Sequence, residues 1–471
     1  MKMRLYPHLK LCLARLGQVV RCQARLVLTL VCLLAFSLPL LACDAFRTEE
    51  IQEVARYGSG GRNLALRLVE AYPFRAPGSP EEAETADFIV QELQSYGYQP
   101  EVQKFSYTSP EGQTRQSQNI VVNIPGRGFQ KSEQAMEEAF TGSRYNQVPA
   151  NLQDLYVLAG AHYDTAYSRS EAQAYDQKAT EAQVDENGNP INTGPQLPPM
   201  LGADGLDDNA AAVASLLTLA VQLKVQAAGS PVRLVFFGAG HDDYAGAKAY
   251  AQSLSPEDQQ NIKAMVNLER IYAGDKVYAH AGQNSVMGGE QKNYALRYPL
   301  YLCTDVYYNN LLLTNNGFAL FTNQAGCRKD LPGVGSCIYR EWTETKGNHT
   351  PFDNMGVPVV FFESADYNLE NCEVPVKESN DPSFSATGGM IAGTPYDSSK
   401  LLLQYFVPEG QIKRADFFGK GNSQPEEEST TTKESLSYVE LTDALEIRIN
   451  NLAFIMSELA SSAPLGWQVK R

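Results

Sequence analysis

The sequence predicts an α/β fold of three layers (αβα), in which a mixed, mostly parallel sheet is flanked by helices. Continuous runs of Val, Ile, Leu and Phe are typical of strands buried on both faces, and helical stretches such as 210–223 separate these runs. The predicted strands span residues 119–124, 155–159, 232–237, 264–268 and 357–362. Ligand sites in such sheets lie at the carboxyl ends of the strands, so the residues that follow these runs are the candidates for chemistry.

Helices are expected on both sides of the strand region. One spans about 48–72. The next begins after Ser79, which has the character of an N-cap because proline follows it and Glu82 stands three residues later. Gly97 ends that helix. A last helix spans about 441–460.

The chain of 471 residues is long for one domain, but large α/β proteins often reach this length through insertions. No internal repeat or long Gly/Pro linker divides the sequence. We therefore predict a single domain over residues 43–471, with polar insertions near 130–151, 166–199 and 373–435.

The first 42 residues are predicted to form a lipoprotein signal peptide. Basic residues precede an apolar run from about Leu26 to Ala42, and Cys43 follows Leu-Leu-Ala directly. This pattern resembles the lipobox of bacterial lipoproteins, in which the cysteine becomes acylated and anchors the protein to a membrane. A plain signal peptide or a transmembrane anchor is the alternative, although the run is short for a spanning helix. We expect a bacterial envelope protein that faces the periplasm or the exterior.

The chain after the signal peptide is strongly acidic. The whole sequence carries a formal charge of −15, and its first 42 residues contribute six basic side chains and no acidic one, so about −21 remains. Such a body repels phosphate backbones, and nucleic acid is therefore not an expected partner.

Four cysteines remain besides Cys43 in a chain predicted to be exported: Cys303, Cys327, Cys337 and Cys372. Exported proteins commonly form disulfides, so up to two are expected, and three pairings are open. Free buried thiols are the alternative. A thiolate metal site is not expected, because no CxxC spacing occurs.

Polar motifs follow the predicted strands. His162 and Asp164 stand in Gly-Ala-His-Tyr-Asp; a neutral imidazole binds zinc, and a nearby carboxylate can fix its tautomer. Asp208 stands at a helix start, where a carboxylate can bridge two cations or simply cap the helix. Glu269 ends a strand.

Two further motifs contain histidine. His241 and Asp242 stand in Phe-Phe-Gly-Ala-Gly-His-Asp-Asp, after the strand at 232–237. His349 stands in Asn-His-Thr-Pro-Phe, just before the last predicted strand. A lone histidine is usually structural, but histidines at several strand ends favour a metal site.

The order and spacing of these five motifs resemble the zinc exopeptidase family that includes bacterial leucyl aminopeptidase, aminopeptidase Y, glutamate carboxypeptidase and glutaminyl cyclase. The resemblance runs from about Arg75 to the end of the chain. It implies the zinc-peptidase fold, which is a mixed, mostly parallel sheet between helices. It also implies zinc and a peptide or small amide substrate, since the family removes terminal residues or, in one branch, cyclises glutamine.

Carried over by position, the resemblance makes His162 a zinc ligand, Asp208 the bridging aspartate and Glu269 the replacement of an aspartate ligand. Asp164 matches the acid that orients the site, and His349 matches a supporting histidine that holds no metal. Together these residues imply one zinc ion, and the family pattern has room for two.

Other positions depart from the family pattern. Gly240 stands where the family has the glutamate that acts as general base, and His241 replaces the next glutamate, a metal ligand. Gly393 replaces a histidine ligand, and Ala392 an aromatic residue that helps to stabilise the oxyanion.

Two interpretations follow. In the first, the protein is a metal-dependent hydrolase in which Asp242 or Asp243 acts as base and His241 or His349 assists. In the second, the same fold binds a peptide or a partner without hydrolysis. The sequence indicates no oligomeric state.

Overall fold

The computed structural model describes residues 58–132, 149–181, 197–286, 293–309, 319–322, 324–327, 338–341, 346–367, 376–406, 444–464 and 466–470. The chain divides into a unit of residues 1–53 and a unit of residues 54–471, and all described residues belong to the second. The predicted signal peptide and the predicted lipidation at Cys43 fall outside the described residues. Within them, no helix has the length and apolar character needed to cross a membrane.

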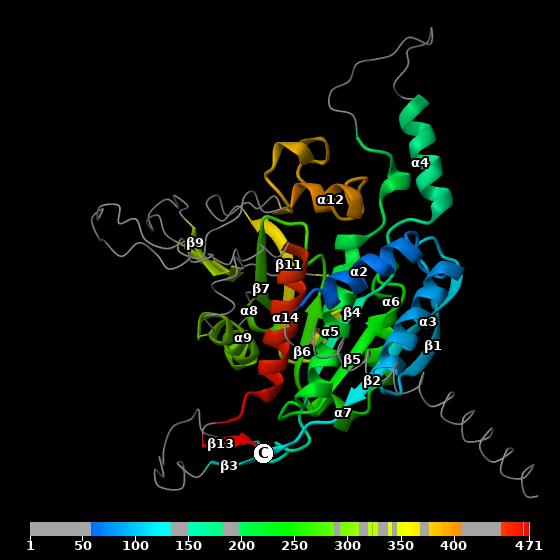
Figure 1. Ribbon diagram of the computed structural model, residues 1–471. Coiled ribbons are helices and arrows are strands. Elements are labelled where there is room, and N and C mark those ends of the chain that lie inside the picture. The colour runs from blue at the N-terminus through cyan, green and yellow to red at the C-terminus, as the bar shows by residue number, and fades with distance from the viewer. Residues whose placement is uncertain are drawn as a thin grey trace, which may run out of the picture. The chain divides into compact units, whose positions relative to one another are not determined.

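The core of the fold is a nine-stranded sheet in the order β1-β2-β5-β4-β6-β11-β7-β8, with β12 paired to β11 (Figure 1). Its strands are β1 (Glu101–Thr108), β2 (Thr114–Ile124), β4 (Tyr156–His162), β5 (Val232–Phe237), β6 (Ile262–Leu268), β7 (Lys276–Ala281), β8 (Leu320–Thr322), β11 (Val359–Tyr367) and β12 (Val376–Lys377). The central strands β5, β4, β6 and β11 run parallel, whereas β1, β2 and β7 pair in antiparallel fashion. The predicted mixed, mostly parallel sheet is confirmed.

Helices cover both faces of this sheet. The described helices are α2 (Gly60–Ala71), α3 (Pro80–Ser95), α4 (Arg169–Glu181), α5 (Ala211–Val225), α6 (Ala245–Ser253), α7 (Pro256–Gln260), α8 (Gln283–Val286), α9 (Tyr298–Asn309), α11 (Thr350–Asn354), α12 (Ser399–Tyr405) and α14 (Ala444–Ser461). Helices α2, α3, α5, α9 and α14 share one hydrophobic core with the sheet, and α6 and α11 share another. Two cores on either side of one sheet give the predicted three layers.

Helix α5 is the best-buried helix of the fold. Its residues from Ala211 to Leu223 are all buried, so it is apolar around its whole circumference rather than along one stripe. The helix lies against α2 and α14 on one side and against β4 on the other. The hydroxyl groups of this helix bond to backbone: Ser215 donates to the Ile449 carbonyl over 3.1 Å, and Thr218 donates to the Ala214 carbonyl over 2.8 Å. Ala210, the residue just before α5, is therefore held rigidly.

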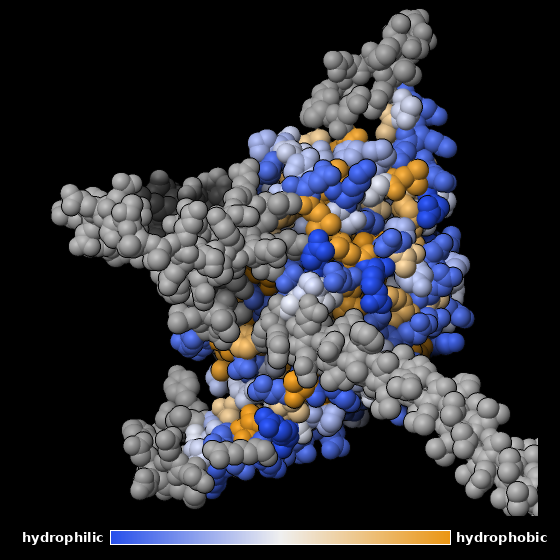
Figure 2. Space-filling model, in the orientation of Figure 1, coloured by the Kyte–Doolittle hydropathy of each residue, from blue (hydrophilic) through white to orange (hydrophobic). Residues whose placement is uncertain are grey.

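Most predicted elements appear close to their expected bounds, and the N-cap of α3 is confirmed. The Ser79 hydroxyl accepts a hydrogen bond from the Glu82 amide over 3.0 Å. Strand β1 was missed because it alternates exposed and half-buried residues at the sheet edge instead of forming an apolar run. The expected polar insertion at 166–199 contains helix α4, where Figure 2 shows mostly hydrophilic residues.

Smaller elements complete the described structure. Strands β3 (Phe129–Lys131) and β13 (Trp467–Val469) pair with each other, as do β9 (Gln324–Cys327) and β10 (Ile338–Glu341). Cys303 on α9 is a buried free thiol. Two disulfides among the four cysteines are thereby excluded. The side chains of Cys327, Cys337 and Cys372 lie outside the described residues, so pairings among them stay predictions.

Glu82 joins α3 to the loop that follows β5. Its carboxylate accepts hydrogen bonds from the Gly78 amide (2.7 Å), the Ser117 hydroxyl (2.8 Å) and the Ala239 amide (2.7 Å). Burial and the charge of nearby Asp164 raise its pKa to about 8, although these hydrogen bonds act in the opposite direction. The folded state therefore keeps a proton on Glu82 that the unfolded chain releases at lower pH.

We predict that Glu82 lowers the free energy of unfolding as pH rises from about 4.5 to about 8. In that window the folded chain binds more protons than the unfolded chain, so the free energy of unfolding falls with pH. Urea unfolding of wild type and Glu82→Gln across this range measures the effect, because the variant lacks the titrating group. Glu81→Gln, at an exposed neighbour, is the matched control. The prediction would be contradicted if the free energies of unfolding of wild type and Glu82→Gln differed by the same amount at every pH.

Candidate metal centre

The carboxyl ends of β4, β5 and β6 bring together the predicted site residues. His162 is the last residue of β4, and His241 lies in the turn after β5. The amide of Asn209 fixes this assembly, since its Nδ2 donates to the carbonyls of His162 (3.3 Å) and Leu268 (3.1 Å). Its Oδ1 accepts from the amide of Arg270 over 3.0 Å. The segment that carries Asp208 is therefore tied to the ends of two strands.

Two imidazoles and two carboxylates alternate in a closed ring. Asp164 Oδ2 accepts from His241 Nδ1 over 3.0 Å, and Asp164 Oδ1 lies 3.4 Å from His162 Nδ1. On the opposite side, Asp208 Oδ1 lies 3.2 Å from His162 Nε2, and Asp208 Oδ2 lies 3.2 Å from His241 Nε2. The two imidazole rings are nearly perpendicular, with centroids 5.0 Å apart. One aspartate thus faces both Nδ1 atoms and the other faces both Nε2 atoms.

Asp164 has the environment of a fixed carboxylate. Besides the imidazoles, it accepts hydrogen bonds from the backbone amides of Gly240 (2.6 Å) and His241 (2.8 Å). Burial raises the pKa of Asp164, but its contacts with His162 and His241 outweigh this and hold the pKa well below its usual range. An ionised carboxylate only accepts, so it favours the tautomer that carries the proton on Nδ1.

This tautomer turns both Nε2 lone pairs toward Asp208. An imidazole lone pair and a carboxylate oxygen 3.2 Å apart repel each other unless a proton or a metal cation lies between them. The pKa values of both histidines reflect this. Burial lowers them, but the two aspartates raise the pKa of His162 to about 9 and that of His241 well above its usual value.

The donor set fits zinc. Imidazole nitrogen and carboxylate oxygen are ordinary zinc ligands, and zinc sites often use a carboxylate behind the histidine. Asp208 Oδ1 is buried and accepts no hydrogen bond from any described residue. One potential ligand atom each from His162, Asp164 and His241 also lie within 4.8 Å of one another. This compact group, found among the described residues, contains neither Asp208 nor Glu269.

A cavity of about 160 Å³ adjoins the histidines. It is lined by His162, Gly240, His241, Asp243, Tyr244 and Glu269. Asp243 and Tyr244 have left-handed backbone conformations, with φ values of 55° and 57°. Such conformations are uncommon for residues other than glycine and often occur at functional sites. Tyr244 was not singled out from the sequence, because only the turn geometry brings it to the cavity.

Glu269 and His349 meet at the wall of this cavity. Asn267 Nδ2 donates to Glu269 Oε2 over 3.2 Å. A Cβ atom on Gly347 would lie 2.6 Å from His349 Nδ1 and 3.3 Å from Glu269 Oε2, so both side chains pack closely on this glycine. The structure therefore places His349 close to Glu269, and the supporting role that the sequence suggested for His349 stays a prediction.

Asp242 is directed toward the edge of the sheet. Its Oδ2 accepts from the Tyr107 hydroxyl over 2.7 Å and from Arg115 Nη1 over 3.1 Å. Its neighbour Asp243 lines the cavity instead. The catalytic role predicted for Asp242 remains a prediction, but these contacts suit it better to anchoring the turn against β1 and β2.

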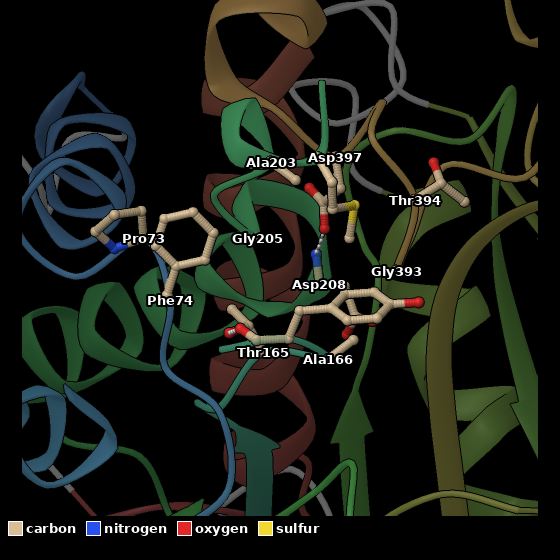
Figure 3. Close-up of a pocket in the computed structure, with 12 residues that line it drawn as sticks. Pro73, Phe74, Thr165, Ala166, Ala203, Gly205, Asp208, Gly393, Thr394 and Asp397 are labelled. Atoms are coloured by element: carbon tan, nitrogen blue, oxygen red, sulfur yellow. Dashed lines mark hydrogen bonds between the residues drawn. The ribbon is translucent and has the colours of Figure 1, made fainter. Parts of the chain in front are cut away.

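The two glycines that break the family pattern differ in their surroundings. A Cβ atom on Gly240 would lie 2.5 Å from both Cβ and Cγ of His162, so there is no room for a side chain. Gly393 has a φ of 64°, and its Cβ would meet only Ala166, 3.8 Å away. Gly393 and Asp208 line a second pocket together with Phe74, Thr165 and Asp397 (Figure 3).

Asp397 is a site residue that the sequence analysis missed. Its Oδ1 accepts from the Asp207 amide over 2.9 Å, and its Oδ2 from the Asp208 amide over 3.2 Å. The carboxylate therefore holds the backbone that presents Asp208. Its position three residues after Thr394, in a motif already compared with the family, was the available signal.

Replacement of Asp164 by asparagine should weaken zinc binding by about 10- to 100-fold, the usual cost of losing a partner behind a metal ligand. The amide presents an N–H group to one imidazole, which forces that ring to carry its proton on the nitrogen facing Asp208. Zinc titration against a competing chelator measures the change. Asp243→Asn is the control, because that carboxylate pairs with Lys248. An unchanged affinity in Asp164→Asn would contradict the shared role of this carboxylate.

Gly240→Ala should destabilise the fold by about 1–3 kcal/mol, because its methyl group must displace His162. It should also weaken zinc binding, so a glutamate cannot simply be restored at this position. Gly202→Ala is the control, since a Cβ there meets nothing within 4 Å. Urea unfolding with and without zinc tests both variants. Equal free energies of unfolding for Gly240→Ala and Gly202→Ala would contradict the prediction and show that His162 can shift freely.

An αβα fold with imidazoles and carboxylates gathered at the carboxyl ends of parallel strands is typical of metal-dependent hydrolases. Residues 145–356 match the model of peptidase family M28. This match confirms the predicted resemblance to zinc exopeptidases.

Two relatives illustrate the similarity in sequence. The chain is 24% identical over 334 residues to the alkaline phosphatase isozyme conversion protein of Escherichia coli (strain K12), covering 70% of this chain and 79% of that protein. It is 33% identical over 87 residues to an aminopeptidase of Pseudomonas aeruginosa (strain UCBPP-PA14), covering 18% of this chain and 16% of that protein. An aminopeptidase relative agrees with the metallo-aminopeptidase character expected from the motifs.

Similar solved structures include two enzymes. The aminopeptidase from Aneurinibacillus sp. strain AM-1 has a TM-score of 0.42 and 14% identity, covering 76% of this chain and 93% of that one. Glutaminyl cyclase from Porphyromonas gingivalis has a TM-score of 0.41 and 16% identity, covering 74% of this chain and 91% of that one.

Proposed function

We propose that this protein is a lipid-anchored, zinc-binding protein of the aminopeptidase type in a bacterial cell envelope, with a degenerate catalytic site. Its ligand is the amino end of a peptide or a small amide, and its hydrolysis is slow. The observation that carries the proposal is the ring in which Asp164 orients two imidazoles and Asp208 faces both Nε2 atoms.

His162, His241 and Asp208 would hold the zinc ion. His241 stands where the resemblance places a glutamate ligand, so a neutral donor replaces a charged one and the bound cation keeps more of its positive charge. Zinc at such a site lowers the pKa of water to about 7 and polarises a carbonyl group. Asp164 keeps the two donor nitrogens in place, and the adjoining cavity gives a small amide access to them.

The proposal of slow hydrolysis rests on the groups that are replaced. Gly240 cannot accept a proton, and Ala392 cannot donate a hydrogen bond to an oxyanion through its side chain. A missing general base and a missing oxyanion donor each commonly cost about 10²-fold or more in rate. Efficient peptide hydrolysis by the usual arrangement is therefore not expected.

A second candidate function is binding without hydrolysis. It is favoured by the crowding at Gly240, which leaves no space for a base at the usual position, and by Gly393, which opens the second pocket beside Asp208. A peptide end would then occupy the cleft as a ligand. Anchoring through Cys43 would place either function at a membrane surface, and the support for this is the lipobox-like sequence.

Metal analysis of the purified full-length protein, paired with a screen of aminoacyl and dipeptide substrates, tests the proposal. Wild type should bind zinc and show slow turnover that a chelator abolishes. His162→Ala should lower zinc affinity at least about 100-fold, since even residues behind a ligand cost 10- to 100-fold. Zinc binding with no turnover would favour the binding function. Absence of both zinc and turnover, in a protein with a native circular dichroism spectrum, would refute the proposal.

A further inference from the structure

We infer that Glu269 is the proton acceptor for hydrolysis in this cavity, in place of the missing base at Gly240, and that it is not a zinc ligand. This inference rests on the proposed function and assigns a new role to a residue that the sequence comparison placed among the metal ligands.

Glu269 is the better placed of the two carboxylates that line the cavity. Among its lining residues, Asp243 and Glu269 carry carboxylates, beside His162 and His241. The Asp243 side chain is 63% exposed and pairs with Lys248 over 2.5 Å, so it belongs to the solvated surface. Glu269 is only 7% exposed. A carboxylate that is shielded from water and lies beside the imidazoles is better placed to receive a proton from a reacting molecule.

Other side chains can supply the zinc ligands without Glu269. Each Asp208 oxygen faces one Nε2 atom at 3.2 Å, so Asp208, His162 and His241 lie close enough together to hold one cation. The family has an aspartate at the position of Glu269, and the additional methylene moves the carboxylate relative to the backbone. If His241 binds zinc through its imidazole nitrogen, then His162, His241 and Asp208 supply three protein ligands without Glu269.

Glu269 is also held in one orientation. Its backbone amide donates to the Phe362 carbonyl over 3.1 Å, and Asn267 donates to its Oε2. Among the described residues no hydrogen bond donor reaches Oε1, so that oxygen is available to accept a proton. The close packing of Oε2 against Gly347 restricts the side chain further. A fixed carboxylate with one available oxygen is what a general base requires.

The reaction step balances as follows. As the oxygen of a water molecule bonds to the carbonyl carbon of the substrate, Glu269 accepts one of its protons. The carbon–nitrogen bond then breaks, and the proton passes from Glu269 to the leaving amine nitrogen. The acyl carbon keeps the hydroxyl oxygen, so one water molecule is consumed and an acid and an amine are formed.

Glu269→Gln separates the two roles, because the amide has nearly the same shape but does not accept the proton. If Glu269 is the proton acceptor, zinc affinity should stay within about threefold of wild type while kcat falls about 10²- to 10⁴-fold. A loss of zinc affinity of tenfold or more would show that Glu269 is a ligand and would overturn the inference. Unchanged turnover would overturn it as well.

Glu269→Asp is the second variant, and it keeps the inference testable if Glu269→Gln misfolds. A metal ligand should tolerate aspartate, which the family itself uses there, whereas a proton acceptor withdrawn by one methylene should lose turnover. We expect retained zinc and at least a tenfold lower kcat. Glu257→Gln, at an exposed residue of α7 outside the cavity, is the matched control and should keep turnover. A wild-type protein that binds zinc without hydrolysing any substrate would overturn both the inference and the hydrolytic proposal, whereas zinc loss in Glu269→Gln alone would overturn only the inference.

Discussion

The arrangement of the site depends on one carboxylate, Asp164, which accepts three hydrogen bonds and also faces a second imidazole. Asp164 accepts the backbone amides of Gly240 and His241 and faces Nδ1 of both His162 and His241. The end of β4 and the turn after β5 are thereby joined through a single side chain. Because a carboxylate has no proton to donate, it imposes the same tautomer on both rings. The backbone path of the turn and the chemistry of the histidines are therefore not independent.

A second layer of buried polar contacts supports the opposite side of the ring. Asp397 holds the amides of Asp207 and Asp208, while Asp207 Oδ1 accepts from the amides of Tyr272 and Ala273 over 2.8 Å each. Arg75 lies in the same region and donates to four backbone carbonyls, those of Tyr72, Tyr163, Asp204 and Gly205. Buried polar networks of this kind fix ligands precisely, because each unpaired member would carry a large desolvation cost.

The sequence predicted the sheet well wherever strands are buried on both faces. Strands β4 and β5 appeared as apolar runs, and their ends carried the histidines that the structure brings together. Strand β7 was missed because its polar residues, Lys276 and His280, interrupt the run; His280 is buried and its Nε2 lies 2.8 Å from Glu363 Oε1. Long-range partners of this kind cannot be inferred from local pattern. The contacts of Asp242 with Tyr107 and Arg115 are long-range in the same way and could not be inferred from the sequence.

The rigid burial of α5 gives the two halves of the ring unequal access to solvent. Asp208 lies three residues before α5, a helix that cannot shift without exposing apolar surface, and the His162 side chain is only 2% exposed. The His241 side chain, on the turn after β5, is 23% exposed. The two imidazoles therefore differ in how readily a small solute from bulk water reaches them, and His241 is the more accessible.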